Sequence, residues 1–118
     1  MQERDNYGQQ LKECFTVHKR RIKNSKFIVD GKLYDTKKSK ILCCTEDDRI
    51  LFVTPKGNYF TCKSVDSEYS EIENGTIQHI FEVNYYGIRI ETEDYVKYNL
   101  GIYDYEMYIE LFGAVEEA

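Results

Sequence analysis

The spacing of apolar positions changes from a helical to a strand-like period soon after the N-terminus. Apolar or aromatic residues recur at helical spacing at Leu11, Phe15, His18 and Ile22, and such a stripe is typical of one face of an amphipathic helix. Lysines and arginines occupy many of the positions between them. The pattern therefore predicts a basic amphipathic helix over residues 1–24.

From residue 26 to residue 91 the pattern is that of short strands separated by turns. Asp30-Gly31 lies between the runs Phe27–Val29 and Lys32–Tyr34, and Asp-Gly between two such runs is a strong signal for a tight hairpin. The only proline lies in Thr54–Gly57, which predicts a second turn. Three further strands are expected at 41–45, 50–54 and 58–63.

The rest of this region is less regular. Residues 64–75 are mostly polar and predict a loop with a weak strand at 68–72. Ile77–Val83 and Ile88–Glu91 predict two separate strands, with Asn84–Gly87 as the bend between them.

The C-terminal part predicts two short helices. Thr92 is a good N-cap and is followed by Glu93 and Asp94, which favour a first helical turn because they face the positive end of the helix dipole. Gly101 is expected to end this helix. A second helix is expected from Asp104, as its cap, to Phe112.

Length and composition indicate that these elements form one domain. The chain has 118 residues, of which 42% are apolar, and this is the size of a single domain. We predict an α+β fold over residues 1–118: an N-terminal helix, an antiparallel meander of about five to six strands over 26–91, and one or two short helices over 92–118 packed on it. No apolar run approaches the ~20 residues of a membrane span, and the first residues lack the pattern of a signal peptide.

The net charge of −5 hides a division between two halves. Residues 1–63 contain 14 basic and 8 acidic residues, a balance of +6. Residues 64–118 contain 2 basic and 13 acidic residues, a balance of −11. The division indicates either two surfaces with different electrostatic preferences or two halves that neutralise each other within one fold.

The sequence contains no recognisable catalytic motif. It has no glycine-rich phosphate loop, nucleophile elbow or zinc-protease motif, and its two histidines are expected to be packing residues. The carboxylates near Thr92 are explained by the helix dipole better than by a metal. The four cysteines lack the spacing of a zinc site and are expected to be small apolar residues of a cytoplasmic protein; they are Cys14, Cys43, Cys44 and Cys62. We therefore predict no catalytic residue, no metal and no cofactor, and hence no enzyme.

Two binding surfaces are better supported. Seven of the 11 tyrosines lie within residues 85–108 among acidic residues, a composition that would suit contact with a basic protein, although the tyrosines would also close a core that lacks tryptophan. The candidate protein-binding residues are Glu91, Glu93, Asp94, Tyr95, Tyr98, Asp104 and Glu106. The basic half would suit phosphate contact. Its candidate nucleic-acid-binding residues are Lys19, Arg20, Arg21, Lys23, Lys37 and Lys38.

Three stretches carry a family resemblance: Asp30–Thr36, Leu51–Phe60 and Tyr105–Ala118. Over roughly residues 27–118, their order and spacing resemble small proteins carried by plasmids, conjugative elements and phages of Gram-positive bacteria. Some of these proteins are type II-A anti-CRISPR proteins, which inhibit the RNA-guided nuclease Cas9. Pro55 stands where that family usually has a lysine, and the family's glycine-rich segment after the second hairpin is missing.

The resemblance implies a binding protein in the cytoplasm of a host bacterial cell. Its partner would be Cas9 or the Cas9 complex with guide RNA, which holds nucleic acid in positively charged channels. The acidic half would then block guide-RNA assembly or nucleic-acid loading. Alternatively, the basic half would contact or trim the guide RNA. The rival function is a nucleic-acid-binding accessory or regulatory protein of a mobile element, and an interaction module with an unrelated protein is a third. The sequence leaves the oligomeric state open, a homodimer included.

Overall fold

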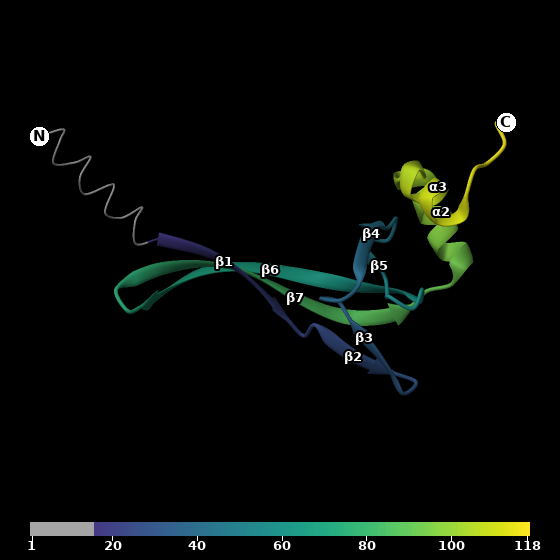
Figure 1. The fold of residues 1–118 in the computed structure, drawn as a ribbon. Helices are drawn as coiled ribbons and strands as arrows, with labels where there is room; N and C mark the ends of the chain where they lie inside the picture. Colours follow the sequence, from purple (N-terminus) through teal and green to yellow (C-terminus); the bar gives the residue numbers. More distant parts are fainter. Residues whose placement is uncertain (1–15) are drawn as a thin grey trace, which may run out of the picture. The chain divides into compact units, whose positions relative to one another are not determined.

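The computed structural model describes residues 16–118 and shows an α+β fold (Figure 1). Seven strands form a five-stranded sheet in the order β1-β7-β6-β5-β4 and a separate two-stranded sheet, β2-β3. The strands are β1 (Thr16–Lys23), β2 (Lys26–Val29), β3 (Lys32–Asp35), β4 (Lys40–Cys44), β5 (Ile50–Val53), β6 (Tyr59–Glu73) and β7 (Thr76–Ile90). They are followed by two helices, α2 (Glu93–Tyr103) and α3 (Tyr105–Phe112).

The chain divides into two compact units, each of which contains part of the long strands β6 and β7. The first unit combines the chain up to Lys23 with Asp66–Val83, and the second combines Asn24–Val65 with Asn84–Ala118. The second unit contains both helices and all the shorter hairpins.

The N-terminal helix predicted over residues 1–24 is wrong where the structure describes that segment, and residues 1–15 lie outside the described part. Thr16–Lys23 forms β1, next to β7 in the sheet. The helical spacing of His18 and Ile22 gave no information about this neighbour. Pairing with another strand supplies backbone hydrogen bonds and cross-strand contacts that outweigh a weak local preference. One such contact joins the rings of His18 and His79, edge to face with centroids 5.6 Å apart.

The weak strand predicted at 68–72 is confirmed as part of β6, but the loop predicted around it within 64–75 and the bend predicted at Asn84–Gly87 are wrong. β6 continues to Glu73, and after a turn at Asn74-Gly75 β7 runs without a break to Ile90. Both turn residues have positive φ, 51° and 76°, as a tight two-residue hairpin turn requires. Gly87 has a φ of 63° within β7, so the absence of a side chain lets the strand continue where a bend was expected.

Polar side chains link the strands of the first unit. Arg21 contacts the Tyr69 hydroxyl at 3.2 Å and the Glu71 carboxylate at 3.4 Å. The Tyr69 hydroxyl in turn donates to Glu82 at 3.2 Å, and Lys23 lies 3.8 Å from the same carboxylate. These contacts explain how a polar segment is held as a strand, because cross-strand pairs stabilise sheets much as spaced pairs stabilise helices.

The short hairpins of the second unit confirm the predicted turns. β2 and β3 pair antiparallel with Val29 opposite Lys32, on either side of Asp30-Gly31. β4 pairs with β5 and β5 pairs with β6, both antiparallel. The register of β4 shifts between Ile41 and Cys43, which is the pattern of a β-bulge and places the intervening Leu42 in the core.

The two faces of β5 contact different layers of the second unit. Leu51, with no exposed surface, packs with Leu42 of β4 and with Val96 and Leu100 of α2. Neighbouring residues of a strand point to opposite faces. Phe52, which follows Leu51, therefore lies in a separate aromatic cluster.

That aromatic cluster is centred on Phe52 and Phe60. The two rings stack with centroids 4.9 Å apart. Tyr85 meets Phe52 edge to face at 5.5 Å, and Tyr34 of β3 meets Phe60 in the same way at 5.3 Å. The α2 helix therefore covers one face of β5, and the β2–β3 hairpin contributes Tyr34 to the other.

Candidate functional site

Local capping positions the two helices that contain most of the predicted protein-binding residues. The Thr92 side chain accepts a hydrogen bond from the backbone N–H of Tyr95 at 3.2 Å. The Asp104 carboxylate accepts one from the N–H of Met107 at 3.2 Å. Both predicted caps are confirmed, as is the end of the second helix at Phe112, whereas the first helix ends at Tyr103 rather than Gly101. Asp104 thus has a structural role at the start of α3.

Glu91 and Tyr95 belong to a charged network at the start of α2. Arg89 places its Nε 2.8 Å from a Glu91 carboxylate oxygen and one of its terminal nitrogens 2.8 Å from Asp47. The Tyr95 hydroxyl donates to the other Asp47 oxygen at 2.6 Å, and the guanidinium lies 5.3 Å from the Tyr95 ring centre. The Glu91 side chain is only 6% exposed, so it is available to Arg89 and not to a partner protein.

The network keeps Asp47 and Arg89 charged and Tyr95 neutral. The hydroxyl of Tyr95, followed by Thr45 and Arg89, holds the pKa of the Asp47 carboxyl far below its ordinary value. Hydrogen bonding to Glu91, with Asp47 next, raises the pKa of the Arg89 guanidinium. Burial, and then the bond to Asp47, raises the pKa of Tyr95. These bonds fix the loop before β5 to the end of β7 and to α2.

Other predicted residues lie on the solvent side of α2. Asp94, Tyr98 and Ile102 are spaced by four residues and therefore share one helix face. Tyr98 is 52% exposed and Ile102 is 58% exposed. Val96 and Leu100, on the other side of the helix, are buried in the core. A hydrogen bond with Glu46 raises the pKa of the Tyr98 hydroxyl.

Exposed aromatic residues continue where α2 gives way to α3. Tyr103 is 53% exposed and Tyr105 is 67% exposed, and Glu106 is exposed in the first turn of α3. We use the term α2–α3 surface for a set of exposed residues on α2 and in the first turn of α3; they are Glu93, Asp94, Tyr98, Ile102, Tyr103, Tyr105 and Glu106. Residues 92–118 contain 7 acidic residues and 1 basic residue, a balance of −6. Ile102, Tyr103 and Tyr105 were not among the predicted site residues. Ile102 could have been found, because it follows Tyr98 by four residues, as Tyr98 follows Asp94.

The predicted basic residues are divided between the two units. Lys19, Arg20, Arg21 and Lys23 lie on β1 and so alternate between its two faces, which excludes the single helical face expected for them. Arg21 and Lys23 are engaged by carboxylates of the first unit, whereas Lys19 and Arg20 are exposed with no ion pair among residues 16–118. Lys37 and Lys38 lie in the turn after β3, in the second unit.

The described cysteines and histidines do not come together as a metal site. Within residues 16–118 no group of three or more histidine, cysteine or acidic side chains could hold a metal ion. Cys62 is fully buried, and burial raises the pKa of its thiol to about 11. Burial also raises the pKa of the Cys43 thiol to about 11, whereas Cys44 is exposed. His79 lies half-buried in β7, with its Nδ1 3.3 Å from the Ser70 hydroxyl.

None of the described helices is both long enough and apolar enough to cross a membrane. Comparison of the chain with family models, curated proteins and solved structures found no match.

Proposed function

We propose that this protein inhibits a type II-A Cas9 nuclease by binding it through the α2–α3 surface and interfering with guide-RNA assembly or nucleic-acid loading. The choice of Cas9 rests on the resemblance of residues 27–118 to mobile-element proteins that include such inhibitors. The choice of surface rests on the structure of the two helices.

The observation that carries the proposed surface is the exposure of tyrosines beside unpaired carboxylates. Tyr98, Tyr103 and Tyr105 each have at least half of their surface exposed, and tyrosine is enriched at protein interfaces because it offers a large contact area with a polar tip. Asp94 and Glu106 are exposed and form no ion pair among the described residues. An acidic surface with this composition is complementary to the positively charged channels in which Cas9 holds nucleic acid.

Charge reversal tests this surface. The variant Asp94→Lys with Glu106→Lys changes two exposed carboxylates in the first turns of α2 and α3, neither of which packs in the core or accepts a capping hydrogen bond. The matched control is Asp66→Lys with Glu68→Lys, two exposed acidic residues of β6 that give the same change in net charge. Glu91 is unsuitable for this test because its carboxylate binds Arg89 inside the protein.

The assay combines a pull-down with purified Cas9 and measurement of DNA cleavage, with circular dichroism as the check of folding. The unmodified protein should bind Cas9 and reduce cleavage. The α2–α3 variant should need at least about tenfold more protein for the same inhibition, since two lost charge contacts of ~0.7 kcal/mol each amount to that factor, and the control should be unchanged. Equal loss in the two variants would exclude the α2–α3 surface as the binding site. The proposed function itself would be refuted if the unmodified protein failed both to bind Cas9 and to inhibit it.

A second candidate function is nucleic-acid binding in support of a mobile element. It is favoured by the exposed and unpaired side chains of Lys19 and Arg20 on β1. In a mobility-shift assay against RNA and DNA, binding through these residues should weaken steeply as salt is added. Lys19→Gln with Arg20→Gln should then flatten the salt dependence, whereas an unchanged slope would place any nucleic-acid contact elsewhere.

A further inference from the structure

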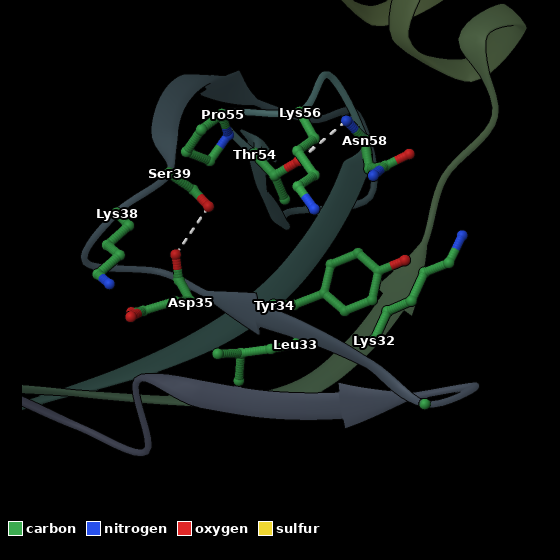
Figure 2. A pocket seen from close by; sticks show the side chains of 11 residues that line it. Lys32, Leu33, Tyr34, Asp35, Lys38, Ser39, Thr54, Pro55, Lys56 and Asn58 are labelled. Atoms are coloured by element: carbon green, nitrogen blue, oxygen red, sulfur yellow. Dashed lines mark hydrogen bonds between the residues drawn. The ribbon is translucent and has the colours of Figure 1, made fainter.

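The second unit contains a cavity of about 610 Å³ that the proposed function does not use. Its wall is made by β3 and the turn after it on one side, and by the Thr54–Asn58 turn on the other (Figure 2). Two of the stretches on which the family resemblance rests, Asp30–Thr36 and Leu51–Phe60, thus contribute to one cavity although they are separated in the sequence. Its volume is within the range of small-molecule sites, roughly 300–1,000 Å³.

Three lysines line the cavity: Lys32, Lys38 and Lys56. Among residues 16–118 none of the three has a carboxylate within ion-pairing distance, whereas Lys40 and Lys97 of the same unit are both paired. The one acidic residue of the lining is Asp35. The lining therefore has a balance of +2, and a cavity that gathers one sign of charge attracts ligands of the other.

The Asp35 side chain is already occupied. One of its carboxylate oxygens accepts the backbone N–H of Lys37 at 3.0 Å, and its backbone carbonyl accepts the Ser39 hydroxyl at 2.7 Å (Figure 2). Asp35 is also 7% exposed. Asp35 is thus held in the turn after β3, and no lysine of the lining forms an ion pair with it among the described residues.

Tyr34 supplies a polar group that has no partner within the described chain. The residue is 94% buried, since only 6% of its surface is exposed, and its ring is fixed edge to face against Phe60. No group of residues 16–118 hydrogen-bonds its hydroxyl. Figure 2 shows the Tyr34 ring between the side chains of Lys32 and Lys56, and all three residues line the cavity. A hydroxyl in this position, on a ring that is itself largely buried, offers a hydrogen bond to a ligand in the cavity.

Hydrogen bonds close the turn on one side of the cavity, and part of the lining is apolar. The Thr54 hydroxyl accepts the backbone N–H of Asn58 at 3.0 Å, and the backbone N–H groups of Thr54 and Gly57 close the same turn with bonds of 2.8 and 2.9 Å. Pro55 and Leu33 add apolar surface to that of the Tyr34 ring. The site therefore combines a hydrogen-bonded turn, apolar side chains and cationic groups.

We propose that this cavity binds a nucleotide, with the lysine ammonium groups on its phosphate and the apolar wall against its ring. Ammonium groups bind phosphate through charge-assisted hydrogen bonds, and the apolar wall favours a ligand that carries a ring over inorganic phosphate. The nucleotide would be either a free molecule or the phosphorylated end of an RNA strand. This site is independent of the α2–α3 surface, so Cas9 inhibition and nucleotide binding succeed or fail separately.

The test is a titration of the ¹⁵N-labelled full chain with five probes: adenosine monophosphate, adenosine, inorganic phosphate, and a short RNA in two forms, with and without a 5′-phosphate. Adenosine monophosphate should shift the amide signals of the cavity residues and bind at least about tenfold more tightly than adenosine, since charge-assisted contacts to the phosphate are lost. Preference for the phosphorylated RNA end would identify the strand as the source, and preference for the monophosphate would identify the free nucleotide. Equal binding of adenosine and its monophosphate, or no binding of any phosphate-bearing probe at millimolar concentration, would overturn the proposal.

Variants connect the binding to the named side chains. Lys32→Gln with Lys56→Gln should weaken the monophosphate at least about tenfold, and Tyr34→Phe, which removes only the hydroxyl, should weaken it about threefold or more. Lys63→Gln is the matched control, because Lys63 is exposed on β6 and does not line this cavity. Unchanged affinity in the double variant, or an equal loss in the control, would contradict the assignment. Tyr34→Phe and the single variant Lys56→Gln keep the test decisive if the double variant fails to fold.

Discussion

The Asp47 carboxylate should make the stability of the protein depend on pH, whereas the adjacent Asp48 carboxylate should not. Its carboxylate accepts a hydrogen bond from the Tyr95 hydroxyl at 2.6 Å and forms an ion pair with Arg89 at 2.8 Å. Charge-assisted bonds contribute about 1.5–3 kcal/mol each when well shielded. Both side chains of the ion pair are 46% exposed, so screening by water reduces the expected loss in Asp47→Asn to about 1–2 kcal/mol at pH 7.

The sign of the pH dependence follows from the direction of the pKa shift. The pKa of the Asp47 carboxyl is lower in the folded protein than in the unfolded chain, so the folded state binds fewer protons and stability rises with pH. The contribution is complete above the unfolded pKa of about 3.9 and is lost as the pH falls toward the lower folded value. The gap between the unmodified protein and Asp47→Asn should therefore narrow as the pH falls below about 5.

Urea unfolding at pH 7, 5 and 3 measures this gap. Asp48→Asn is the matched control: Asp48 is exposed in the same turn, its side chain has no partner among the described residues, and asparagine tolerates its φ of 58°. The control should follow the unmodified protein at every pH. A gap for Asp47→Asn that is absent at pH 7, or that stays constant down to pH 3, would refute the assignment of the network.

Two further predictions test the core and the thiols. Leu51→Ala should lower the free energy of unfolding by about 2–5 kcal/mol in urea unfolding because it opens a cavity at a fully buried position, whereas Ile28→Ala, at a position that is 77% exposed, should change it by less than about 0.5 kcal/mol; equal losses would contradict the assigned core. Cys44 should be alkylated by iodoacetamide well before Cys62 in the folded protein, as mapped by mass spectrometry, because Cys62 is buried and its thiol pKa is raised to about 11. Equal rates for the two cysteines would contradict the burial of Cys62.

The parts of the fold that sequence reasoning predicted are those set by local chemistry. Thr92 and Asp104 cap helices through their own side chains, and Asp30-Gly31 turns a hairpin because both residues adopt positive φ, 50° and 73°. Such signals lie within a few residues of the structure that they determine. They are readable without knowing what the segment packs against.

The segments that were mispredicted depend on partners distant in the sequence. The apolar residues of β1 have helical spacing, and its sequence does not show that it pairs with β7. Likewise the polar part of β6 reads as a loop, but Tyr69 and Glu71 are held by Arg21, 48 and 50 residues away. No local pattern contains these pairings.

The candidate site was predicted in composition but not in the roles of its members. The acidic, tyrosine-rich character of the helical end was evident from the sequence. Which carboxylates face solvent was not, because Glu91 and Glu93 lie two residues apart and yet one has a side-chain exposure of 6% and the other of 60%. The lysine-lined cavity was not predicted as a site, although Lys38 was a candidate nucleic-acid-binding residue, since the cavity requires two hairpins to come together in the folded chain.

The most direct test of the proposed function is an order-of-addition cleavage assay with purified type II-A Cas9. The protein is added either before or after the guide RNA, and the fraction of target DNA cut is measured at equal concentrations. Blocked assembly predicts strong inhibition when the protein is added first and weak inhibition when the guide is already bound. Inhibition in both orders would place the block at nucleic-acid loading instead, and full cleavage in both orders would contradict the proposal that this protein inhibits Cas9.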